Sequence, residues 1–169
     1  DIDFLRHHRA YITGVIDRID ECVDEEGNEN LAKQRFLDWP SSPNKPGVEA
    51  GCRALLSWAL KDAEVLCNLL EEQEHAKKCR AISKRLKKQI KQPNGLKQAA
   101  ALMSIAGLMK PEQACSEVIS VGGAKDFSTF YGYYMLQALA QAGEYQQAVD
   151  IIRQYWGCLL YTSDAADER

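Results

Sequence analysis

Glycine and proline are scarce in this sequence, with 11 glycines and 5 prolines among 169 residues. That composition excludes a collagen-like or low-complexity chain. The sequence also lacks any apolar run approaching the roughly 18 residues that a membrane-spanning helix needs, so we expect no membrane partner. Neither sign of charge dominates, because 21 basic and 24 acidic residues leave a net charge of −3. A strongly basic nucleic-acid-binding surface is therefore not expected.

The two ends of the chain carry unusual sequences. The first residues, DIDFLR, are neither a methionine start nor a signal peptide, so we expect the chain to begin within a longer protein. The last twelve residues, 158–169, resemble the in-frame translation of a sequencing adapter and no protein family. We therefore expect a non-native tail at 158–169. Without it, residues 1–157 hold 20 basic and 21 acidic residues, a net charge of −1.

Paired cysteines and clustered histidines are also missing. The five cysteines that remain form no C-x-x-C pair, and the three histidines are not spaced as metal ligands beside them. An odd number of unpaired cysteines argues against a disulfide framework and favours a reducing compartment such as the cytoplasm. We predict no metal site and no cofactor. The cysteines are interpreted as reduced packing residues: Cys22, Cys52, Cys67, Cys79 and Cys115.

Apolar residues recur at helical spacing along most of the chain and predict an all-α fold. Seven helices are expected, at 3–25, 47–71, 75–91, 96–106, 110–120, 127–142 and 144–156. Their joints are short except for one loop at 26–46. A loop of roughly 20 residues is longer than ordinary connections and suggests a function.

The expected helices alternate in character. Those at 47–71, 96–106 and 127–142 are apolar nearly all round and should be buried, whereas the others have wide polar faces. A repeated outer–inner hairpin builds either an α/α barrel or an α-solenoid. In both cases the loops that lead into the inner helices share one rim. That rim would bring loop 26–46 together with 92–95 and 121–127.

Three segments carry a resemblance to a known family. They are FLDWP at 36–40, GVEAGCRALLSWAL at 47–60, and FSTFYGYY at 127–134, which is followed by MLQALAQAG. Together they resemble the six-hairpin catalytic domain of bacterial α-L-rhamnosidases, glycoside hydrolase family 78. The resemblance runs from residue 1 to about residue 157 and implies that 1–157 is part of an (α/α)6 barrel.

The resemblance also implies a chemistry, the inverting hydrolysis of terminal α-L-rhamnosides by a carboxylic acid and a carboxylate base. In the family, the acid lies on an acidic loop well upstream, and nothing before Phe36 matches it. The base lies just beyond a Tyr-Trp-Gly sequence, which this chain has at 155–157. We therefore expect no catalytic residue in this chain, which would contribute only part of the sugar-binding rim.

The predicted substrate-binding residues are Asp38, Trp39 and Tyr131, and the predicted partner is a rhamnose-containing carbohydrate. A carboxylate at Asp38 can accept hydrogen bonds from two ring hydroxyls, and the indole of Trp39 offers a flat face to ring C–H groups. Each residue also has a structural interpretation. Asp38 could cap the loop, Trp39 could pack under it, and Tyr131 could belong to the core.

Two alternatives remain open. Residues 127–156 also resemble one tetratricopeptide-like hairpin, which would make the chain an α-helical repeat scaffold that binds protein partners. That pattern does not recur along the sequence. A basic run at 77–91 suggests nucleic acid, but the acidic residues just before it favour a solvated outer helix face.

Overall fold

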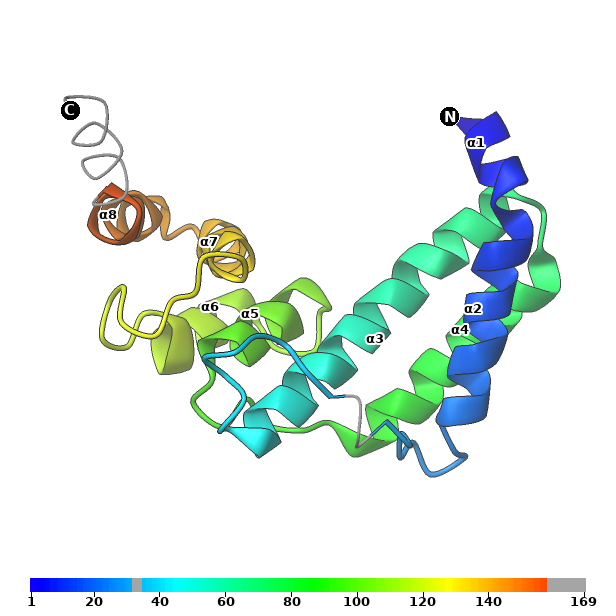
Figure 1. Cartoon of the computed structure of the whole chain (residues 1–169), viewed down its shortest axis with the longest axis horizontal. Coiled ribbons are helices and arrows are strands. Elements are labelled where there is room, and N and C mark those ends of the chain that lie inside the picture. Colours follow the sequence, from blue (N-terminus) through cyan, green and yellow to red (C-terminus); the bar gives the residue numbers. More distant parts are fainter. Residues whose placement is uncertain (32–34, 158–169) are drawn as a thin grey trace, which may run out of the picture. The chain divides into compact units, whose positions relative to one another are not determined.

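All regular elements in the part of the chain that the structure describes are helices (Figure 1). The structure is a computed structural model that describes residues 1–31 and 35–157. The predicted non-native tail at 158–169 lies outside the described residues. Within them, extended backbone pairs only at an isolated bridge between Val23 and Glu29. The prediction of an all-α fold is confirmed.

The chain divides into two compact units. Unit 1 comprises Asp1–Arg35 and Cys52–Lys91, and unit 2 comprises Phe36–Gly51 with the described residues from Gln92 onward. The long helix α3 (Lys45–Leu69) contributes its first turns to unit 2 and the remainder to unit 1.

Unit 1 is a helical layer around one apolar core. Its helices are α1 (Ile2–His7), α2 (Arg9–Cys22), most of α3, and α4 (Gln73–Leu86), which continues as the 3-10 turn η2 (Lys87–Gln89). The core is built from apolar side chains of α2, α3 and α4 together with Val23, which directly follows α2. The buried members are Ile16, Val23, Leu60, Cys67, Ala76, Cys79, Ile82 and Leu86. Their burial is the main favourable contribution to this unit's stability.

The single helix predicted at 3–25 is wrong in two places. It is interrupted at His8, whose backbone (φ −96°, ψ 6°) leaves the helical region between α1 and α2. It then ends at Cys22, because Val23 is extended (φ −119°, ψ 112°) and pairs with Glu29. The bridge between Val23 and Glu29 therefore ends α2 at Cys22, three residues before the end that the apolar pattern predicted.

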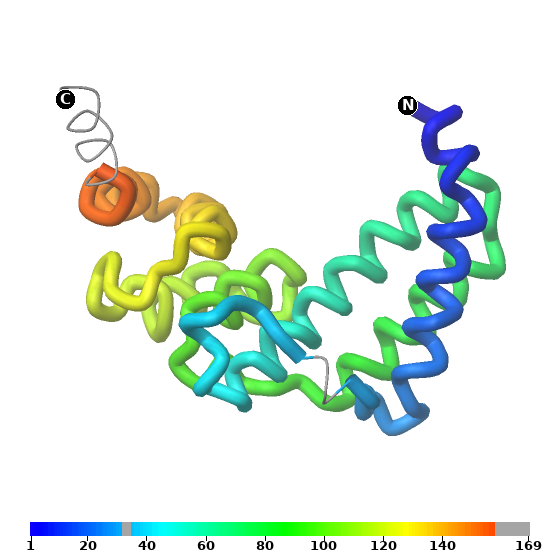
Figure 2. Tube along the Cα trace, viewed as in Figure 1, coloured from blue at the N-terminus to red at the C-terminus, as the bar shows by residue number. Residues whose placement is uncertain are grey.

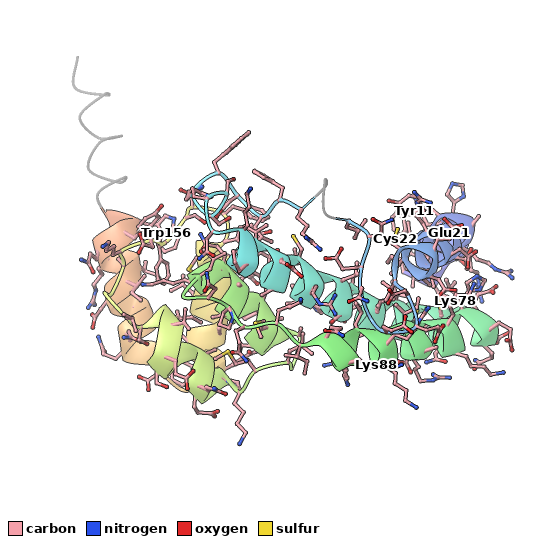
Figure 3. All side chains as sticks on the ribbon, turned by 90° about the horizontal axis from the view of Figure 1, so that it is seen from below. Tyr11, Glu21, Cys22, Lys78, Lys88 and Trp156 are labelled. Atoms are coloured by element: carbon pink, nitrogen blue, oxygen red, sulfur yellow. The ribbon has the colours of Figure 1, made fainter. Side chains whose placement is uncertain are left out.

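Ion pairs join α4 to its neighbours in unit 1. Lys78 Nζ lies 2.6 Å from Asp17 Oδ1 on α2, and Arg85 pairs with Asp20 on the same helix. Figure 1 shows α2 and α4 side by side, and Figure 3 labels Lys78 on α4. Arg80 Nη1 also reaches Glu64 Oε1 on α3, at 2.7 Å. Part of the basic run is therefore used to hold helices together rather than only to face solvent.

Unit 2 is built around α5 (Lys97–Ile105), on which α7 (Gly132–Gln141) packs. The other elements are α6 (Pro111–Ala114), the π-helical turn η3 (Cys115–Ile119) and α8 (Tyr145–Tyr155). Every residue of α5 from Lys97 to Ser104 is buried, as the all-round apolar pattern predicts.

Two features of the predicted inner helices are corrected. The helix expected from 127 begins at Gly132, because residues 128–131 form a turn after Asp126, whose φ is +63°. The helix expected to be buried at 47–71 is not, since Val65 and Leu69 are 56% and 57% exposed. In unit 1, the core covers only the face of α3 that carries Leu60 and Cys67.

Candidate functional site

Three loops of unit 2 are joined by hydrogen bonds. Asn44 Nδ2 donates to the carbonyl of Asn94 at 3.0 Å, and Asn94 Nδ2 donates back to Asn44 Oδ1 at 2.8 Å. Ser128 Oγ donates to Asp38 Oδ2 at 2.7 Å. The end of loop 26–46 therefore meets both the 92–95 turn and the loop before α7. The hydrogen bonds bring these segments together, as the sequence predicted, while a shared barrel rim stays a prediction.

Asp38 lies at the junction of three segments of unit 2. Its Oδ1 accepts the backbone N–H of Ser41 at 2.9 Å. Its Oδ2 accepts both Gln98 Nε2 from α5, at 3.0 Å, and the Ser128 hydroxyl, at 2.7 Å. Figure 2 shows the chain after residue 36 passing beside the start of α5. The carboxylate is thus the common acceptor for its own turn, for α5 and for the loop that precedes α7.

The turn around Asp38 is built by short polar side chains. The carbonyl of Asp38 accepts the hydroxyls of Ser41 and Ser42, at 3.1 and 3.0 Å. Asn44 then accepts the N–H of Gly47 at 3.1 Å, which satisfies a free donor in the first turn of α3. Serine and asparagine favour such turns because their side chains hydrogen-bond the nearby backbone. The bond from Ser41 N–H shows that Asp38 does cap its own loop.

Close packing beneath this turn depends on Gly51 of α3. A Cβ at that position would lie 2.5 Å from Leu37 Cδ1 and 3.4 Å from Ala99 Cα. Leu37 is buried, and it directly precedes Asp38. The missing side chain therefore lets Leu37 anchor the turn against α3.

The environment of Asp38 favours its ionised form. Burial raises the pKa of the carboxyl, but the hydrogen bonds from Ser41, Ser128 and Gln98 outweigh it, so the pKa lies below its ordinary value of 3.8. Ser41 acts on this pKa through its hydroxyl as well as its N–H, but the hydroxyl donates to the Asp38 carbonyl at 3.1 Å. The Ser41 N–H, Gln98 Nε2 and the Ser128 hydroxyl therefore occupy three of the roughly four acceptor positions of the carboxylate. Asp38 can therefore accept about one further hydrogen bond in this geometry, rather than the two that its sequence context suggested.

Trp39 presents an open ring face. Its side chain is 84% exposed, and its ring meets that of Phe36 edge to face, with centroids 5.1 Å apart and planes at 70°. Phe36 is itself half exposed. With 84% of the side chain exposed, this one ring contact leaves most of the indole surface accessible. Trp39 therefore does not pack beneath the loop.

Tyr131 lies in the interior of unit 2, only 6% exposed. Its ring contacts those of Phe130 and Tyr134, with centroid separations of 5.3 and 5.7 Å. Phe130 is 68% exposed and follows Ser128 by two positions. The structure thus gives Tyr131 a packing position behind Phe130 and leaves Phe130 as the ring open to solvent.

Gln98 is a site residue that sequence reasoning missed. Its side chain is only 2% exposed, and it lies in a helix made mostly of alanine, leucine and methionine. The neighbouring Lys97 is also buried, with Nζ donating to the carbonyl of Gly123 at 2.7 Å and lying 5.1 Å from the centre of the Phe127 ring. Two adjacent polar residues at the start of an apolar helix were the signal that could have identified this pair.

Residues 1–31 and 35–157 carry no sign of a metal centre or a membrane span. Those residues include no group of three or more histidine, cysteine or acidic side chains that could hold a metal ion. No helix among them has the length and hydropathy of a membrane span.

Comparison with known proteins gave no match, whether to protein-family models, to curated proteins or to solved structures.

Proposed function

We propose that this chain supplies part of the sugar-binding rim of a glycoside hydrolase of the α-L-rhamnosidase type. The observation that carries the proposal is the adjacency of an ionised carboxylate, Asp38, and an exposed indole, Trp39. The catalytic acid and base are expected outside this chain, and the helical hairpins are proposed to be part of an α/α barrel.

The chemistry of a sugar ring matches this pair. A pyranose presents hydroxyl groups at its edge and a patch of C–H bonds on its face. The free acceptor position of Asp38 can receive one hydroxyl, in a charge-assisted hydrogen bond. The open face of Trp39 can cover the C–H patch, where burial of apolar surface is favourable. Phe130 lies near the Ser128–Asp38 bond in sequence and offers a further exposed ring.

The choice of rhamnose rests on the motifs. Asp38 and Trp39 belong to the FLDWP segment, and Ser128 and Tyr131 belong to the FSTFYGYY segment, which are two of the segments that resemble the family. The hydrogen bond between Asp38 and Ser128 joins these two segments at the rim. Tyr131 would support the site from behind Phe130.

A titration of the full chain with methyl α-L-rhamnoside tests the proposal, followed residue by residue by NMR chemical shifts. Shifts centred on residues 36–42 and 127–131 are expected, and Trp39→Ala should weaken binding about tenfold through loss of the buried apolar face. Tyr11→Ala is the matched control, because Tyr11 is an exposed aromatic (72%) in unit 1. Absence of shifts at millimolar sugar, or equal losses in both variants, would contradict the proposal.

One further sugar and one substrate sharpen the test. If methyl β-D-glucoside binds as tightly as methyl α-L-rhamnoside, the chain has a sugar site but no preference for rhamnose. An aryl α-L-rhamnoside should not be hydrolysed by the chain, and turnover would show that a catalytic pair is present after all.

A tetratricopeptide-like scaffold is the second candidate function. The α7–α8 hairpin favours it, because Gly143 closes the turn at φ +79° and apolar side chains of α8 remain exposed, among them Tyr145 at 66%. A scaffold of this kind would bind a peptide, and the titration with methyl α-L-rhamnoside would then produce no chemical shift changes.

A further inference from the structure

The side chain of Gln98 is held against the Asp38 carboxylate. Gln98 Nε2 donates to Asp38 Oδ2 at 3.0 Å, and the Ser128 hydroxyl donates to the same oxygen at 2.7 Å. Both donors are buried, at 2% and 7% exposed. Oδ2 is thus enclosed by two inward-facing donors, whereas Oδ1 has one backbone donor and can accept another hydrogen bond.

Packing alone does not explain this glutamine. Its other amide atom, Oε1, is buried without a hydrogen-bond partner among the described residues. A buried acceptor without a partner destabilises the folded state. A methionine of similar length would fill the same space without that cost. What Gln98 adds to the fold is the N–H that it gives to Asp38.

We propose that Gln98 is a positioning residue, whose amide fixes the Asp38 carboxylate so that Oδ1 is available to a ligand hydroxyl. The hydrogen bond by which Gln98 fixes Asp38 follows from the geometry alone. The effect of this hydrogen bond on sugar binding rests on the proposed function.

The test compares three variants of the full chain. Gln98→Met removes the donor at nearly constant volume, and Gln98→Glu puts a second carboxylate against Asp38. Gln113→Met is the matched control, because Gln113 Nε2 also donates to a carboxylate, Glu117 Oε1 at 3.1 Å, on the exposed side of unit 2. The first readout is the titration of the Asp38 carboxyl carbon by NMR, which needs no sugar.

The expected order of the Asp38 pKa is native chain lowest, Gln98→Met higher, and Gln98→Glu highest. Gln113→Met should leave it unchanged. The free energy of unfolding of Gln98→Met should change little at neutral pH, because the higher pKa of Asp38 lowers stability while removal of the unpartnered Oε1 raises it. An unchanged Asp38 pKa in both Gln98 variants would overturn the proposal, as would a loss of stability with no change in that pKa.

The second readout is the affinity for methyl α-L-rhamnoside as a function of pH. Binding needs the ionised carboxylate, so affinity falls as pH drops through the pKa of Asp38. In Gln98→Met that fall should move to higher pH, with about a tenfold weaker affinity at neutral pH. If the native chain binds no sugar, the proposed function fails while the Asp38 titration still decides the role of Gln98.

Discussion

The Ser128 hydroxyl donates to Asp38 Oδ2 at 2.7 Å although the two residues are 90 positions apart in the chain. Closing so long a loop costs conformational entropy. One short hydrogen bond does not offset that cost, so the contact depends on the packing of α7 on α5. The bond therefore reports whether unit 2 is folded around its site.

Asp38→Asn should reduce the pH dependence of stability. Because the folded-state pKa of Asp38 is lowered, its ionised form contributes stability above the ordinary value of 3.8. That contribution is lost as pH falls through the lowered pKa. Asparagine has one acceptor oxygen where aspartate has two, so it cannot accept the donors at both Oδ1 and Oδ2. The variant should therefore be less stable than the native chain by about 1–3 kcal/mol at neutral pH. This difference in stability should narrow in acid, where the native Asp38 becomes protonated.

Urea unfolding between about pH 6 and about pH 2 measures this gap. Asp62→Asn serves as control, because Asp62 is exposed on α3, and its curve should run parallel to that of the native chain. A gap between Asp38→Asn and the native chain that stays constant with pH would show that Asp38 is not stabilised as an anion.

Gly27→Ala should destabilise unit 1 strongly. Gly27 has φ +83°, and a Cβ there would lie 2.1 Å from the carbonyl oxygen of Arg85. Both the left-handed backbone and this clash disfavour alanine, and we expect a loss of about 3 kcal/mol or more. Gly14→Ala is the opposite case, since a Cβ within α2 would meet nothing within 4 Å. Gly14→Ala should therefore stabilise the chain by about 0.5–1 kcal/mol. Thermal unfolding measures both variants, and equal changes in their melting temperatures would contradict the expected difference between Gly27 and Gly14.

Arg53→Met should also destabilise unit 1. Arg53 is buried, and its Nη2 donates to the carbonyls of Gly27 and Leu86 at 2.9 and 3.0 Å. Without the guanidinium, both carbonyls lose a buried donor, at a cost of about 3 kcal/mol. Arg18→Met should change the free energy of unfolding little, because Arg18 forms an exposed pair with Glu21. Denaturant unfolding of the two variants provides the comparison.

The cysteines should differ in reactivity. Burial raises the pKa of the thiols of Cys79 and Cys115 to about 11 and also raises that of Cys67, so these groups stay protonated and covered near pH 8. Cys22 and Cys52 are only half buried. Alkylation of the native chain, mapped by mass spectrometry of its peptides, should label Cys22 and Cys52 before the other cysteines of residues 1–157. Rapid labelling of Cys79 or Cys115 would mean that the cores open readily.

Apolar spacing predicted much of the fold because burial follows it directly. The all-round apolar pattern of α5 predicted a helix whose residues Lys97 to Ser104 are indeed buried, and the outer–inner alternation predicted that Asp38 and Ser128 lie at the same end of the hairpins. Helix ends were less predictable. The break at His8 and the late start of α7 at Gly132 depend on backbone angles and on loop contacts that the apolar period does not encode.

The site was predicted only in part, for a related reason. Asp38 and Trp39 could be proposed because their chemistry is visible in the sequence. Gln98 was missed, because a glutamine beside a lysine is typical of an exposed pair, and only its position at the start of an apolar helix indicated burial. Tyr131 and Phe130 are neighbours of the same chemical type, and only tertiary packing determines which ring is covered.

The exposure of Trp39 has a spectroscopic consequence. It is one of three tryptophans, and the other two, Trp58 and Trp156, are half buried. Fluorescence from the 84% exposed indole should lie at longer wavelengths and be quenched most readily by iodide. A molecule that covers the ring would shift that emission to the blue and shield it from the quencher. The chain thus carries an intrinsic optical reporter beside Asp38, which needs no attached dye.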